Sequence, residues 1–232
     1  MKLDFVGPDL SLGPLPAIFY FALSAKESLF QDPFNQPVIV WQTYPLRIFS
    51  LTLPEHEGHL EPNHAVLAFW KEEMAKGRNP IKEFTDQASR EIHKLKNEGL
   101  LTPGKLAVAG LSRGAFMAAH LAAVIPEVRT ILGFAPLTGF PEFPQYDLTR
   151  LIPQLADRTL RFYIGNRDQR VGTARCFQFI EQLAEAAFQR NVRSPPIELI
   201  ITPSIGYQGH GTSKAIFEGG ARYLAEQLGI SP

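Results

Sequence analysis

The sequence has one cysteine, no excess of charge of either sign and no long hydrophobic run. With Cys176 as the only cysteine, no intrachain disulfide can form, which fits a reducing compartment. The 23 basic and 23 acidic residues sum to zero charge and leave no basic surface for nucleic acid or an anionic membrane. No apolar run approaches the ~20 residues of a membrane span, and acid, glycine and proline interrupt the N-terminal MKLDFVGPDLSLGP before a signal-peptide core forms. We therefore expect a cytoplasmic protein that binds neither nucleic acid nor membrane.

What the sequence does contain is an alternation of strand-like and helix-like segments. Apolar runs rich in β-branched or aromatic residues occur at 17–23, 46–53, 105–111, 130–137, 159–165 and 197–202. Most are continuously apolar, which is typical of strands covered on both faces. Helical patterns occur at 63–77, 80–99, 116–125, 173–189 and 214–228. This alternation predicts an α/β fold with a mainly parallel sheet of about six or more strands, flanked by helices on both faces, in one domain over residues 1–232.

The segment Gly110-Leu111-Ser112-Arg113-Gly114 lies where an apolar strand passes into an alanine-rich helix. Gly-x-Ser-x-Gly at such a turn is the pattern of a nucleophile elbow, in which the serine backbone is strained and flanking glycines avoid collisions. The hydroxyl then faces the carboxyl edge of the sheet, where open α/β folds bind ligands. The alternative is a tight turn with a capping serine.

A serine nucleophile needs a histidine base and a carboxylate that orients the histidine. In this kind of fold both follow the serine, in the order acid then histidine, each after a later strand. Asp168 follows the run at 159–165, and His210 lies between two glycines before the last helical pattern. His120 is two helical turns behind the serine. We predict that Ser112, Asp168 and His210 form a catalytic triad; the alternatives are a turn residue at 168 and a surface histidine at 210.

On these residues the sequence resembles the α/β-hydrolase superfamily of serine hydrolases, and within it the dienelactone-hydrolase-like and prolyl-oligopeptidase-like branches. The resemblance covers residues 17–228 and is strongest in GLSRG (110–114), GNRDQRVG (165–172) and GHGTS (209–213). Dienelactone hydrolases proper use a cysteine nucleophile, whereas this chain has a serine.

The resemblance also implies an oxyanion hole made of two backbone N–H groups. One is expected from Arg113, the residue after the nucleophile. The second is expected from Leu23, with Ala22 and Ser24 as alternatives, because the stretch FALSAKESL lacks the His-Gly that relatives often carry there. A backbone donor tolerates any side chain except proline, so the hole does not depend on His-Gly.

The connection 138–157, where this fold usually inserts a lid, has room for a loop and one short helix at 147–155. Phe140, Phe143 and Tyr146 are candidates for an apolar substrate pocket, or they cover the sheet edge. So short a lid predicts an open site for small or mid-sized substrates.

We expect no metal site and no cofactor. His56, His59 and His64 lack the helical His-Glu-x-x-His spacing of zinc proteases. Cys176 is expected to be a small buried residue. The Arg113 side chain either binds a substrate anion or is solvated or ion-paired.

Together these features predict a serine hydrolase that cleaves a carboxylic ester or related acyl bond of a small molecule through an acyl-enzyme. A short-peptide serine peptidase and a non-catalytic hydrolase-fold binding module are the alternatives. The sequence does not indicate an oligomeric state.

Overall fold

A computed structural model describes residues 2–54, 64–141, 143–191 and 196–231. These residues form a seven-stranded sheet in the order β1-β3-β2-β4-β5-β6-β7. The strand β1 runs antiparallel to β3, and every other neighbouring pair is parallel. The strands are β1 Asp4–Val6, β2 Leu15–Phe21, β3 Arg47–Ser50, β4 Leu101–Leu111, β5 Thr130–Phe134, β6 Thr159–Gly165 and β7 Ile197–Thr202. The predicted mainly parallel sheet is confirmed.

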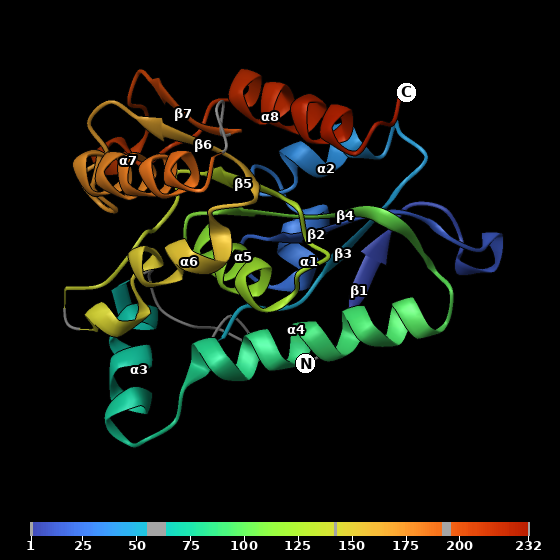
Figure 1. Ribbon diagram of the computed structural model, residues 1–232, viewed down its shortest axis with the longest axis horizontal. Helices are drawn as coiled ribbons and strands as arrows, with labels where there is room; N and C mark the ends of the chain where they lie inside the picture. Colours follow the sequence, from blue (N-terminus) through green and yellow to red (C-terminus); the bar gives the residue numbers. More distant parts are fainter. Residues whose placement is uncertain (1, 55–63, 142, 192–195, 232) are drawn as a thin grey trace.

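Helices cover both faces of this sheet (Figure 1). One face carries α1 Ala25–Phe30, α2 Gln36–Trp41 and α8 Lys214–Gln227, and the other carries α3 His64–Ala75, α4 Pro80–Asn97, α5 Arg113–Val124, α6 Ile152–Leu155 and α7 Thr173–Gln189. Among the described residues, no helix combines the length and the apolar character needed to cross a bilayer.

The strand β2 shows why a continuously apolar run belongs in the middle of such a sheet. Successive side chains of a strand point to opposite faces. Accordingly Phe19 and Phe21 pack in the core beneath α4 and α5, while Ile18 and Tyr20 pack in the core beneath α2 and α8. All four side chains are fully buried, so both faces of β2 require apolar residues.

A buried arginine ties the N-terminal segment to the sheet. Arg47 in β3 has no exposed surface. Its guanidinium donates to the carbonyl oxygens of Pro8, Asp9 and Leu100 at 3.0, 2.7 and 2.9 Å. Each carbonyl therefore has a charged donor in place of water.

The structure contains three short elements that the sequence patterns did not predict: β1, α1 and α2. Each has six residues or fewer, too few for hydrophobic periodicity to appear. The α1 helix nevertheless carries a start signal, a capping box between Ser24 and Glu27. The single short helix expected at 147–155 is in fact a 3-10 turn at Leu148–Leu151 followed by α6.

Candidate active site

Ser112 lies at the sharp turn between β4 and α5. Its backbone has φ 55° and ψ −115°, a positive φ that is costly for a residue with a side chain. The Ser112 N–H donates to the carbonyl of Phe134 at 2.8 Å, which holds the turn against β5. Arg113 follows as the first residue of α5, so its N–H belongs to the helix N-terminus beside the serine. The strained backbone predicted at this turn is present.

The flanking glycines allow backbone segments to touch. A Cβ atom at Gly110 would lie 2.2 Å from the carbonyl carbon of Gly114. A Cβ atom at Gly114 would lie 1.9 Å from the carbonyl oxygen of Phe21 in β2. These distances are far below van der Waals contact, so any side chain would separate α5 from the strands beneath it.

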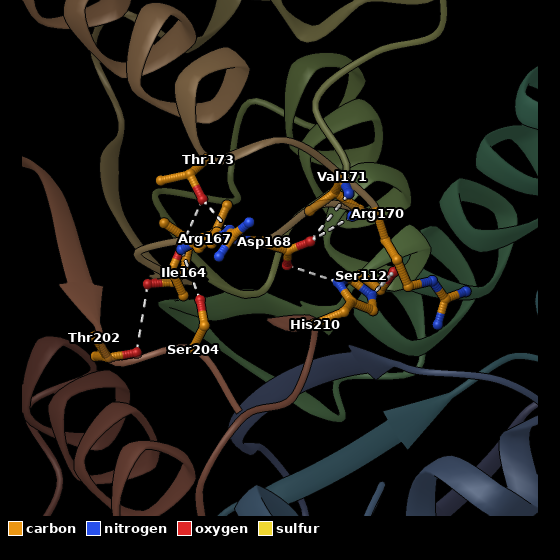
Figure 2. Close-up of polar contacts among 11 residues, drawn as sticks. Ser112, Ile164, Arg167, Asp168, Arg170, Val171, Thr173, Thr202, Ser204 and His210 are labelled. Atoms are coloured by element: carbon orange, nitrogen blue, oxygen red, sulfur yellow. Dashed lines mark hydrogen bonds and ion pairs between the residues drawn. The ribbon is translucent and has the colours of Figure 1, made fainter. Parts of the chain in front are cut away.

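Figure 2 shows Ser112, His210 and Asp168 meeting at one edge of the sheet, although they come from three separate connections. His210 Nε2 lies 2.9 Å from Ser112 Oγ, and His210 Nδ1 lies 2.7 Å from Asp168 Oδ2. The Asp168 side chain has no exposed surface and that of His210 only 11 %. The structure therefore brings together all three predicted triad residues in the predicted order of contact.

The Asp168 carboxylate is held by its own loop. Its Oδ1 accepts the N–H groups of Arg170 and Val171 at 3.0 and 3.1 Å. The Asp168 N–H in turn donates to Thr173 Oγ1, at the start of α7, at 2.9 Å. Since the loop satisfies Oδ1, Oδ2 is left to accept from the imidazole, and the carboxylate keeps one orientation.

The His210 loop is shaped by the two glycines that bracket it. Gly209 has φ +73°, a conformation that side chains disfavour. The Gly211 N–H donates to the carbonyl of Ile205 at 2.7 Å, and a Cβ at Gly211 would lie 2.8 Å from that oxygen. The loop thus closes on itself and presents the imidazole toward Ser112.

The N–H expected to be the second oxyanion donor is already hydrogen-bonded within the protein. The N–H groups of Ala22 and Leu23 both donate to Oγ of the buried Ser28, at 3.0 and 3.2 Å. The Ser24 N–H donates to the Glu27 carboxylate at 3.1 Å. Leu23 lines the same cavity as Ser112, but its N–H donates to Ser28 in this structure. Its role as an oxyanion donor stays a prediction.

Two cavities lie at this edge of the sheet. One, of about 260 Å³, is lined by Ser112, His210 and Leu23, among others. The second, of about 500 Å³, is lined by Phe140 and Phe143, among others.

The third candidate pocket residue, Tyr146, lines neither of these two cavities. Its hydroxyl accepts from Asn79 Nδ2 at 3.0 Å, and its carbonyl lies 3.0 Å from His120 Nε2. Sequence patterns do not distinguish these two placements, because all three aromatic residues are in one irregular connection.

The remaining polar candidates are structural or lie outside the described residues. Burial lowers the pKa of the His120 imidazole to about 4, so this residue is neutral near pH 7. Cys176 is fully buried as expected, and burial raises the pKa of its thiol to about 12. His56 and His59 lie outside the described residues, within which no cluster of metal-ligating side chains occurs.

No family model and no curated protein matches the sequence. Solved structures do resemble it. TT1662 from Thermus thermophilus is 18% identical with a TM-score of 0.67, covering 97% of this chain and 93% of its own. A cold-adapted esterase from an Arctic intertidal metagenomic library is 16% identical with a TM-score of 0.70, covering 97% and 88%. A candidate dienelactone hydrolase from Klebsiella pneumoniae is 13% identical with a TM-score of 0.69, covering 98% and 92%. The chain has the α/β-hydrolase fold.

Proposed function

We propose that this protein is a serine hydrolase that cleaves a carboxylic ester or related acyl bond of a small to mid-sized molecule. The observation that carries the proposal is the hydrogen-bonded chain from Ser112 through His210 to Asp168. Two of the proteins with similar folds support it, since one is an esterase and the other a candidate dienelactone hydrolase. The single sheet that carries all three residues supports treating the chain as one catalytic domain.

In this proposal, Asp168 keeps the proton of His210 on Nδ1, which leaves the Nε2 lone pair directed at the Ser112 hydroxyl. Ser112 Oγ then attacks the carbonyl carbon of the ester while its proton passes to Nε2. The resulting imidazolium is stabilised by the buried carboxylate.

The tetrahedral intermediate carries a negative oxygen, which we expect the N–H of Arg113 to bind because it is the first N–H of α5. Leu23 can assist if its N–H is shared with, or released from, Ser28 Oγ. Collapse of the intermediate breaks the ester C–O bond. The departing alcohol takes the proton from Nε2, and the acyl group stays on Ser112.

Hydrolysis of the acyl-enzyme repeats these steps with water as the nucleophile. Water adds to the acyl carbon as Nε2 takes its proton. Collapse then releases the carboxylic acid and returns the proton to Ser112 Oγ. No cofactor enters this sequence of steps.

A fluorophosphonate probe tests the proposal, because it phosphonylates a serine only where a base activates it. We expect one label on the intact protein, located at Ser112 by peptide mass spectrometry, and none on the Ser112→Ala variant. Labelling at another residue, or a folded wild-type sample that stays unlabelled, would overturn the assignment.

A further inference from the structure

Arg170 lies at the boundary between the two cavities at the candidate active site. It lines both the cavity that contains Ser112 and the larger one beyond it. In Figure 2 its side chain runs past Ser112, and the guanidinium lies on the side of the serine away from Asp168. A group bound to this guanidinium would therefore be close to the reacting carbonyl.

The backbone of Arg170 is fixed by the triad itself, since its N–H donates to Asp168 Oδ1. The guanidinium, in contrast, makes no ion pair with a carboxylate among the described residues. An arginine that lines a cavity in this way offers its donor fork to a ligand.

A second arginine lies near Arg170 at the smaller cavity. Arg113 also lines it, although only 7 % of the residue is exposed. Burial and, secondly, the nearby charge of Arg170 lower the pKa of the Arg113 guanidinium to about 10. Arg113 makes contacts of its own.

The larger cavity determines what else the ligand contains. Its apolar walls are formed by Trp70, Met74, Leu137, Phe140 and Phe143, and its polar lining includes Lys71, Gln169 and Arg175 besides Arg170. The volume of about 500 Å³ accommodates an aromatic ring with substituents. Trp70 and Phe140 meet edge to face with ring centroids 6.0 Å apart, which gives the cavity a rigid wall.

We propose that the substrate is an ester with an anionic group, such as a carboxylate, on an aromatic or similarly bulky apolar body. The apolar body occupies the larger cavity and Arg170 binds the anion, making Arg170 a specificity-determining residue. That the ligand is an ester rests on the proposed function, but the binding of an anion beside Ser112 does not depend on turnover.

Binding is tested first, in the Ser112→Ala variant, which cannot consume the ligand by the proposed route. The probes are 4-acetoxybenzoate and 4-acetoxybenzamide, which differ by a carboxylate in place of a neutral amide, measured by titration calorimetry. A charge-assisted pair predicts that the carboxylate binds about tenfold to a hundredfold more tightly. Adding Arg170→Gln should remove that preference and leave the binding of the amide within about twofold.

Arg167→Gln is the matched control. It removes the same charge from the same loop, but Arg167 is exposed and lines neither of the two cavities. The preference should survive in this variant. Equal binding of the two probes, or equal loss of the preference in both arginine variants, would overturn the role of Arg170.

Turnover by the wild-type protein separates this inference from the proposed function. In 4-acetoxybenzoate the carboxylate is on the alcohol side of the ester, with 4-acetoxybenzamide as its neutral partner. In monoethyl terephthalate the carboxylate is on the acyl side, with ethyl 4-carbamoylbenzoate as its neutral partner. A higher kcat/KM for the anionic member of either pair, lost in Arg170→Gln, supports the inference. If turnover depends on Ser112 but neither pair shows a preference for the anionic member, the inference is refuted and the proposed hydrolase function is retained. Selective binding of the carboxylate without turnover supports the inference and refutes the proposed hydrolase function.

Discussion

Gly114→Ala tests whether α5 packs directly on the backbone of β2, the contact that positions the elbow. The new Cβ would lie 1.9 Å from the carbonyl oxygen of Phe21, 2.5 Å from its carbonyl carbon and 3.1 Å from the Ala22 nitrogen. Ordinary contact needs about 3.5 Å, so helix and strand must separate by roughly 1.5 Å. All three atoms belong to the backbone of β2 and the turn that follows it, and β2 is hydrogen-bonded to strands on both sides. No side-chain rotation can relieve the clash.

The expected cost follows from these distances. Overpacking a core typically costs about 1–3 kcal/mol and occasionally more; we expect about 3–5 kcal/mol here, because only backbone atoms can move to relieve the clash. Alanine regains at most about 1 kcal/mol of helix propensity. We expect a net loss of about 2–4 kcal/mol, which for a chain of this size lowers Tm by about 4–16 °C.

The chain offers a control in Gly219→Ala. Gly219 is also helical, in α8, but it is exposed and a Cβ there has nothing within 4 Å. Only the propensity gain remains, so Tm should rise by about 2–4 °C. Thermal unfolding followed by circular dichroism compares the two variants at one scan rate. If Gly114→Ala matched wild type or moved Tm upward with the control, the direct contact between α5 and β2 would be refuted.

Three further predictions concern polar groups. Asp168→Asn keeps the shape of the triad but favours the wrong imidazole tautomer, so kcat for a neutral ester should fall about 10⁴-fold with Tm changed by a few degrees at most; unchanged kcat would exclude Asp168 from catalysis. Burial depresses the pKa of His120 from 6.5 to about 4, so unfolding takes up a proton between those values. The free energy of unfolding that depends on neutral His120 is fully present above about pH 6.5, and roughly 3 kcal/mol of it is lost as pH falls toward 4. Urea midpoints at pH 7.5 and 4.5 should therefore converge in His120→Gln, and an unchanged gap would assign the acid sensitivity elsewhere. Arg47→Met removes the donor from three carbonyls of partly buried or exposed residues and should cost about 1–3 kcal/mol in urea unfolding, with Arg47→Lys only partly restoring it because lysine lacks the planar fork; full rescue by lysine would show that charge alone matters.

The buried strands and long helices were predictable because each has a regular apolar pattern of its own. The strand β6 and the helix α7 have the bounds expected from the sequence, Thr159–Gly165 and Thr173–Gln189. The strand β4 instead begins at Leu101, four residues before the apolar run, because its first residues are only partly buried or exposed and pair with β2 across an irregularity near Leu15. Partial burial removes the hydrophobic signal and leaves the hydrogen bonds that define the strand.

The placement of the three candidate triad residues could also be predicted from the sequence, since the topology brings the carboxyl ends of parallel strands to one edge. Ser112, Asp168 and His210 each follow a strand at that edge, and glycines mark the tight turns around two of them. The lining of the pocket was harder to predict from the sequence. Phe140 and Phe143 face a cavity while Tyr146 turns to Asn79, and such choices depend on side-chain partners far away in the sequence.

The oxyanion donors lie beyond sequence reasoning for a different physical reason. A backbone N–H is present at every residue except proline, so only its direction carries information, and that direction depends on which acceptor is near. Here the acceptor is the Ser28 hydroxyl, which faces Ala22 and Leu23 from α1, the first helix after β2. The same hydroxyl donates its own hydrogen bond to the carbonyl of Ser24. Of the two bonds, the one from Leu23 is the longer, at 3.2 Å, so it costs the least to share with a developing oxyanion. If the second oxyanion donor comes from this turn, its present acceptor must share or release it as charge develops on the substrate: Ser28 for the N–H of Ala22 or Leu23, and Glu27 for that of Ser24.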